Sequence, residues 1–207
     1  MCIRDSDFLF VRDLELDGTT HAELDIDGGS GQDQIEVENV EVARNFTVRG
    51  GLHNDRILVD EVFAKSINTK GDGGNDVLDV FDSSAREHIY IRGGSGNDQF
   101  RIYDNFAGES IRTWGDDGRD IAIHIGLNAE DIFVYGGDGD DAFHMIDSRA
   151  NDGMYAFMGD GDDNLHMERS WSQRHYLDGG AGRDFVGRNG WFGTGSWSNN
   201  HSFERWW

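Results

Sequence analysis

The chain has 207 residues, enough for one domain of ordinary size or two small ones. Its 18 Lys and Arg face 40 Asp and Glu, and the net charge of −22 disfavours nucleic acid or an anionic membrane surface as the main partner. No apolar run approaches the length of a membrane span. Twenty-nine glycines and no proline predict a soluble acidic protein with glycine-shaped turns that binds cations.

The first six residues, MCIRDS, match the translation of a transposase end sequence used to build sequencing libraries. We interpret residues 1–6 as a sequencing-adapter scar that is not native, and we expect the natural chain to begin further upstream. Cys2, the only cysteine, belongs to this scar, so the native segment offers no thiol chemistry. Residues 7–27 are expected to form an incomplete first coil, in which Leu24 and Ile26 match a strand of the later repeats.

A glycine-rich hexad ending in aspartate recurs every 21 or 22 residues. The eight hexads are GGSGQD, GGLHND, GDGGND, GGSGND, GDDGRD, GGDGDD, MGDGDD and GGAGRD. Their closing aspartates are Asp33, Asp55, Asp76, Asp98, Asp120, Asp141, Asp163 and Asp184. So regular a period predicts a repeat architecture over residues 28–187.

Each repeat carries two short strand patterns. Apolar residues recur two positions after each closing aspartate, and four positions after six of the eight, with mostly polar residues between them. This is the alternation of a half-buried strand. A second pattern precedes each hexad, as at Ile89 and Ile91. Small residues such as Ala64 and Ala85 lie between the two patterns and predict an inward-pointing position at a tight bend. The isoleucines of residues 121–125 take the opposite phase and predict a local register shift.

The glycine content and the absence of i, i+3, i+4 spacing exclude a helical repeat. The sequence therefore predicts an all-β, right-handed parallel β-solenoid of about eight coils, in which neighbouring coils supply the core. Each coil has two short strands, and residues 40–42 and 62–64 could add a third. Residues 188–207 hold four of the six tryptophans and are predicted to form an aromatic C-terminal cap. A carbohydrate-binding aromatic patch is the alternative for this segment.

Each hexad begins a nonapeptide, as in GGSGNDQFR at residues 93–101. Here the chain resembles the hemolysin-type (RTX) calcium-binding repeats, which form parallel β-rolls. That family repeats its nonapeptide about every nine residues, whereas this chain has one in each coil. The resemblance implies Ca²⁺ held between stacked turns on one edge of the solenoid, with the opposite edge empty.

Elementary physical chemistry points to the same cation. Calcium prefers six to eight oxygen ligands, glycines can turn their carbonyls toward a common centre, and stacked carboxylates repel one another without a counter-ion. We therefore expect Ca²⁺ in the gaps between the closing aspartates, with the gap between Asp141 and Asp163 the strongest and those flanking Asp55 the weakest. The further candidate ligands are Asp72, Asp116, Asp138, Asp160, Gly28, Gly93, Gly136 and Gly179.

Two other functions stay open. Gly-Asp turns also form without metal, because aspartate can cap its own backbone, so the chain could be a metal-independent adhesive or spacer solenoid. It could also be a fragment of a β-helix polysaccharide lyase or epimerase, with an extracellular polysaccharide as partner. Side chains for such a site are His88, Tyr90, Arg92, Arg101, Tyr103 and Arg112. The outward pair His144 and His166 is interpreted as stacked or solvated rather than as a transition-metal site.

No nucleophile elbow or cysteine nucleophile is present, so no catalytic residue is assigned and the chain is not predicted to be an enzyme. The sequence predicts a calcium-binding structural module of a secreted or cell-surface bacterial protein. Extracellular calcium modules commonly bind at about 10⁻⁴–10⁻³ M, so folding would depend on leaving the cell.

Overall fold

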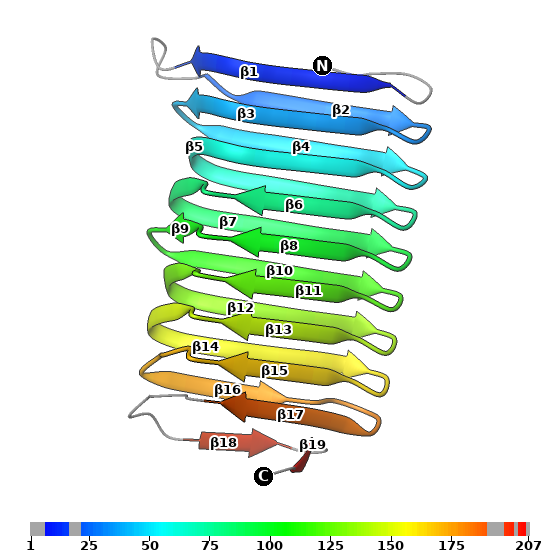
Figure 1. Ribbon diagram of the computed structural model, residues 1–207, viewed down its shortest axis with the longest axis vertical. Helices are drawn as coiled ribbons and strands as arrows, with labels where there is room; N and C mark the ends of the chain where they lie inside the picture. The colour runs from blue at the N-terminus through cyan, green and yellow to red at the C-terminus, as the bar shows by residue number, and fades with distance from the viewer. Residues whose placement is uncertain (1–6, 17–21, 190–196, 201–202, 206–207) are drawn as a thin grey trace.

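The computed structural model describes residues 7–16, 22–189, 197–200 and 203–205. The chain forms a parallel β-solenoid of about eight turns, in which each coil stacks on the next along one axis (Figure 1). This confirms the predicted fold class. No helix among the described residues is long and apolar enough to cross a membrane.

One row of strands follows the closing aspartates, and a second row precedes the next hexads. The first row comprises β1 (Phe8–Leu16), β3 (Gln34–Val42), β6 (Val77–Phe81), β8 (Gln99–Tyr103), β11 (Ile121–Ile125), β13 (Ala142–Ile146), β15 (Asn164–Glu168) and β17 (Asp184–Asn189). The second row comprises β2 (Leu24–Ser30), β4 (Asn45–Leu52), β7 (Ser84–Ser95), β10 (Ser110–Asp117), β12 (Asn128–Asp138), β14 (Arg149–Asp160) and β16 (Arg174–Asp178). Between the rows, β5 (Arg56–Gly73) runs unbroken through the bend, whereas β9 (Phe106–Ala107) is a separate short strand there.

Residues 7–27 supply strands to both rows ahead of the first hexad. Strand β1 pairs with β3, and β2 pairs with β4 through Leu24 and Phe46. The predicted match of Leu24 to the second strand is therefore confirmed. Residues 1–6, interpreted as the adapter scar, lie outside the described residues.

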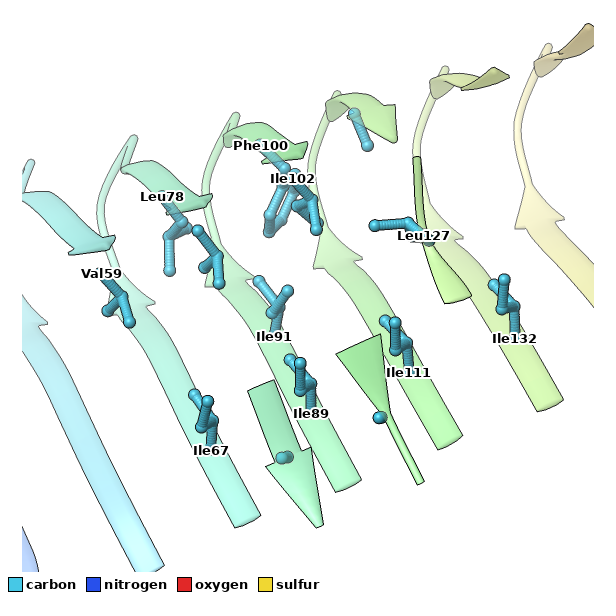
Figure 2. Packing of buried hydrophobic residues seen from close by; sticks show 14 of the residues in the cluster. Val59, Ile67, Leu78, Ile89, Ile91, Phe100, Ile102, Ile111, Leu127 and Ile132 are labelled. Carbon is cyan, nitrogen blue, oxygen red and sulfur yellow. The ribbon is translucent and has the colours of Figure 1, made fainter. Parts of the chain in front are cut away.

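The core lies between the two rows of strands. Val59 and Leu78 from the first row and Ile67 and Ile89 from the second are fully buried and point into the same interior (Figure 2). The column of small residues at the bend is also buried, with Ala64 fully inaccessible, which confirms its predicted inward position. Stacking of identical columns thus builds one continuous core along the rod.

The predicted register shift at residues 121–125 is wrong. Strand β11 pairs without interruption with both β8 and β13, and Ala122 and His124 point inward while Ile121 is exposed. Thr113 Oγ1 lies 3.0 Å from His124 Nε2, and burial lowers the pKa of His124 to about 4. Backbone pairing fixes the inward phase here, although it places a histidine inside and isoleucines outside.

The register shifts that do occur lie at the bend. Ala64 pairs with Ala85, 21 residues later, whereas Ser66 pairs with His88, 22 residues later. The same change occurs between β12 and β14 after Ala129. The bend therefore accommodates the extra residue of the longer coils and leaves the strands in register.

The C-terminal segment continues the stacking of strands. Strand β18 (Trp197–Asn200) pairs with β16, and β19 (Phe203–Arg205) pairs with β17. The tryptophan side chains of the cap predicted over residues 188–207 lie outside what the structure describes.

Candidate metal site at the glycine–aspartate corner

Each hexad turns the chain between the two rows of strands at what we call the glycine–aspartate corner. The second and fourth hexad residues take positive φ, as at Gly94 (116°) and Gly96 (128°). Three non-glycine residues hold the same conformation, namely His53 (83°), Asp72 (74°) and Asp116 (75°). These three departures from the glycine pattern therefore leave the corner geometry intact, at the cost of a conformation that side chains disfavour.

The closing aspartates align in one column, as predicted, but they lie inside the corner and not on its outer rim. All eight are at most 3% exposed. From Asp33 to Asp163, the backbone N–H of each closing aspartate donates to Oδ1 of the closing aspartate one coil later. Examples are Asp76 N–H to Asp98 and Asp98 N–H to Asp120, both at 2.7 Å. The ladder extends to Asp7, whose N–H donates to Asp33 Oδ1 at 2.7 Å. Sequence reasoning missed Asp7 because no hexad precedes it.

A second ladder runs beside the first with the opposite direction of donation. At the fifth hexad position, Asn97 N–H donates to Asn75 Oδ1 of the preceding coil, and Arg119 N–H donates to Asn97 Oδ1, both at 2.7 Å. The two ladders satisfy successive backbone N–H groups of the turn with protein oxygens alone.

The second carboxylate oxygen of the column has no such partner. The Oδ2 atoms that are buried without any hydrogen bond belong to Asp33, Asp55, Asp76, Asp98, Asp120, Asp141 and Asp163. A Cβ added to Gly93 would lie 2.2 Å from Asp98 Oδ2 and 2.8 Å from the carbonyl oxygen of Gly115 in the next coil. The carboxylate oxygen and a carbonyl oxygen thus approach the same point. Hard oxygen donors of this kind fit calcium.

The predicted glycine ligands stand at the first hexad position, where this approach occurs. Gly28, Gly93, Gly136 and Gly179 are all buried. In the seventh hexad the position is held by Met158, whose side chain lies in the core. A side chain therefore occupies the first hexad position beside Asp163, in the gap between Asp163 and Asp184. The gap predicted to be the strongest keeps Gly136, whose added Cβ would lie 2.5 Å from Asp141 Oδ2 and 2.1 Å from the carbonyl oxygen of Met158.

Burial raises the pKa of six aspartates of the column, because the charged form loses its hydration. Neighbouring carboxylates add to this rise for most members, while the N–H bond to Oδ1 opposes it. The resulting pKa values are about 7 for Asp55 and Asp98, about 6 for Asp76, Asp120 and Asp163, and about 8 for Asp141. At neutral pH the column therefore favours binding of a proton or another cation.

The remaining predicted ligands lie away from the column. Asp72, Asp138 and Asp160 are exposed, and Asp116 accepts a hydrogen bond from Arg92 Nη2 at 2.7 Å. In the described parts of the chain, no three His, Cys, Asp or Glu side chains form a group that could hold a metal. A calcium ion here would rely on one buried carboxylate oxygen in each gap together with backbone carbonyls.

The opposite corner also carries a buried polar ladder, which sequence reasoning missed. Ser83 N–H donates to Asn105 Oδ1 at 3.0 Å, and Ser148 N–H donates to Ser170 Oγ at 3.2 Å. These residues stand seven positions after their closing aspartates, and that recurrence of Ser or Asn was the available signal.

The side chains considered for a polysaccharide lyase do not share one face. His88, Tyr90, Arg92 and Arg112 lie on β7 and β10, whereas Arg101 and Tyr103 lie on β8 in the other row of strands (Figure 1). Arg101 is held in an ion pair by buried Asp79.

Ring contacts hold Tyr103 and also the outward pair of histidines that the sequence singled out. Tyr103 stacks on Phe81 with ring centroids 5.1 Å apart. The tilted rings of His144 and His166 are 5.5 Å apart. Among the described residues, no third His, Cys, Asp or Glu joins His144 and His166 in a group that could hold a metal ion.

Comparison with known proteins finds no matching family model, no matching curated protein and no matching solved structure.

Proposed function

We propose that this chain is a structural β-solenoid module of a secreted or cell-surface protein, and that Ca²⁺ binds between its coils at the glycine–aspartate corner. The supporting observation is the row of seven buried Oδ2 atoms without a hydrogen-bond partner. A bound cation would neutralise these carboxylates and join adjacent coils. Asp98 Oδ2 and the Gly115 carbonyl oxygen exemplify the donors available in one gap.

Calcium binding of this kind contributes directly to folding. The unfolded chain does not hold the carboxylate and carbonyl oxygens together, so the binding free energy adds to the free energy of unfolding. Calcium at 100 times its dissociation constant stabilises by about 2.7 kcal/mol for each site. In a chain of this size, each kcal/mol raises the melting temperature by about 2–4 °C.

A metal-independent spacer solenoid is the second candidate, and the Oδ1 ladder favours it. The N–H bonds to Oδ1 close the corner without any metal, and a proton on Oδ2 would neutralise the same carboxylate. The two candidates differ in whether stability at neutral pH responds to calcium.

The decisive experiment measures thermal unfolding by circular dichroism at pH 7.5, in EGTA and in 10 mM CaCl₂. The calcium proposal expects a higher melting temperature in calcium and not in magnesium. The test variant carries Asp98→Asn, Asp120→Asn and Asp141→Asn, which keep the Oδ1 acceptor but remove the charge. It removes three of the seven unpartnered Oδ2 atoms and should lose a corresponding part of the calcium response.

The matched control carries Asp82→Asn, Asp104→Asn and Asp147→Asn at the opposite corner. These aspartates are exposed, and asparagine tolerates their positive φ. The control has the same net charge as the test variant and should keep the full calcium response. Equal melting temperatures of the wild type in EGTA and in calcium would reject the calcium proposal in favour of the spacer.

A further inference from the structure

A surface pocket crosses three successive coils on the second row of strands. Its volume is about 280 Å³. In the strand register, Asn68, Tyr90 and Arg112 form one column, and Lys70, Arg92 and Trp114 form the next. These six side chains line the pocket. Adjacent columns on one face thus bring distant parts of the sequence into a single concavity.

The pocket concentrates positive charge on a chain whose net charge is −22. Arg92 is paired with Asp116. Lys70 and Arg112, by contrast, have no carboxylate within 4.0 Å among the residues that the structure describes, although the Arg112 charge acts to lower the pKa of Asp131. Arg112 Nε is buried and has no hydrogen-bond acceptor. Two cationic groups are therefore available to an anionic ligand.

Aromatic rings hold Arg112 in place. Its guanidinium carbon lies 4.7 Å from the ring centre of Phe133 and 5.8 Å from that of Tyr90. Such cation–π contacts orient the guanidinium without neutralising it. A fixed guanidinium retains the geometry that binds a carboxylate through two parallel hydrogen bonds.

A stack of rings ends at the pocket. Trp114, Tyr135 and Phe157 stack in successive coils, with interplanar angles of 5° and 9°. On the pocket side, the neighbour of Trp114 in the same column is Arg92, and the ring of Tyr90 is tilted by 48°. The stack therefore ends beside the cations, where an amphipathic ring can contact a ligand that has both apolar and polar faces.

We propose that this pocket binds the carboxylated sugar residues of an acidic polysaccharide. Arg112 and Lys70 bind the sugar carboxylate, Trp114 contacts the apolar face of the sugar ring, and the Asn68 amide and Tyr90 hydroxyl bind its hydroxyl groups. The negative field of the whole chain opposes both kinds of polyanion, so nucleic acid is the competing ligand that the experiment tests with oligouridylate. This inference does not depend on calcium at the glycine–aspartate corner.

The test is isothermal titration calorimetry in EGTA, which prevents calcium from bridging the chain and the ligand. The probes are tetrasaccharides of polygalacturonate, alginate and hyaluronan, with maltotetraose as neutral sugar and oligouridylate as nucleic acid. At least one acidic tetrasaccharide should bind, and its affinity should fall as NaCl rises. Maltotetraose and oligouridylate should bind at least about tenfold more weakly.

The test variants are Arg112→Gln and Lys70→Gln, each of which should weaken binding by about tenfold or more. The matched control is Lys65→Gln, which removes the same charge from a lysine already paired with Glu87, and it should bind like wild type. Absence of acidic-sugar binding by the wild type would overturn the proposal. So would equal losses in all three variants, or preferential binding of oligouridylate.

Discussion

A Cβ added to Gly93 would lie 2.2 Å from Oδ2 of Asp98. Gly93 does not adopt a positive φ, so the space beside the carboxylate is the reason for glycine at this position. We expect Gly93→Ala to destabilise by about 1–3 kcal/mol, the range of an overpacked core. The measurement is urea unfolding followed by circular dichroism.

Gly73→Ala is the matched control for this variant. The nearest atom to a Cβ at Gly73 is Ser95 Oγ at 3.4 Å, which is ordinary contact. The control should be neutral or stabilising by about 0.4–1 kcal/mol. Equal effects of the two alanines would show that Asp98 does not constrain Gly93.

The buried aspartate column predicts that the metal-free chain loses stability as the pH rises. The folded pKa values of Asp55 and Asp98, about 7, and of Asp141, about 8, lie well above the usual value near 3.9. The folded state therefore binds protons that the unfolded state has released, and stability falls as pH rises through the folded pKa. In EGTA, the melting temperature should decrease between pH 6.5 and 8.5.

Between pH 6.5 and 8.5, the pH dependence of stability comes mainly from the aspartates and little from buried His124. The lowered pKa of His124 acts in the opposite direction, but its effect fades above about pH 6.5, as the unfolded histidine also loses its proton. Asp98→Asn should flatten the pH dependence. A melting temperature that rises across the window would contradict the raised pKa values.

Glu61 is expected to be a strained position. Its φ of 51° lies in the left-handed region, six residues after Asp55, where other coils carry Asn39, Asp82 or Gly126. A left-handed conformation costs a side chain about 1–2 kcal/mol, so Glu61→Gly should raise the free energy of unfolding by about 1 kcal/mol.

The control for Glu61 is Glu41→Gly in β3. Glu41 is also exposed but has no positive φ, and glycine in a strand costs about 0.5–1 kcal/mol. The two substitutions should therefore have opposite signs in chemical denaturation. Destabilisation by both would mean that Glu61 is held by contacts that outweigh its strain.

Asn105 is expected to be essential at the opposite corner. Its amide donates to the carbonyl oxygens of Val80 and Tyr103, at 2.8 and 2.9 Å, and its Oδ1 accepts the Ser83 N–H. Asn105→Ala leaves these buried groups without partners and should cost about 2–4 kcal/mol in equilibrium unfolding. Exposed Asn128→Ala is the control, and it should change stability by no more than about 0.5 kcal/mol.

Much of the fold could be predicted from residues that repeat in register. The alternation at Ile57 and Val59, together with the constant return of the hexad, predicted stacked parallel strands with a shared interior. The prediction at Ile121 was wrong because side-chain hydrophobicity was given more weight than backbone pairing. The polar corner at Asn105 was missed because a buried asparagine and an exposed one look alike in sequence.

The candidate site was predicted less completely than the fold. The sequence aligned Asp98 and Asp120 in one column, but it could not show that the column is buried. It also could not show that Oδ1 accepts a neighbouring N–H while Oδ2 has no partner. The sequence named Arg112 only within a set of candidate lyase residues. The structure places the members of that set on two different faces, and only some of them line the pocket.

By itself, the sequence determined the period, the parallel stacking and the columns of the solenoid, because these follow from local alternation and from glycines that permit one repeated turn. Only the tertiary structure decided which side of the corner the carboxylates occupy, which of their oxygens are satisfied, and that Lys70 and Arg112 share a pocket. Burial and hydrogen bonding across coils join residues about 21 or 22 positions apart, so both depend on how the coils stack and not on any single repeat.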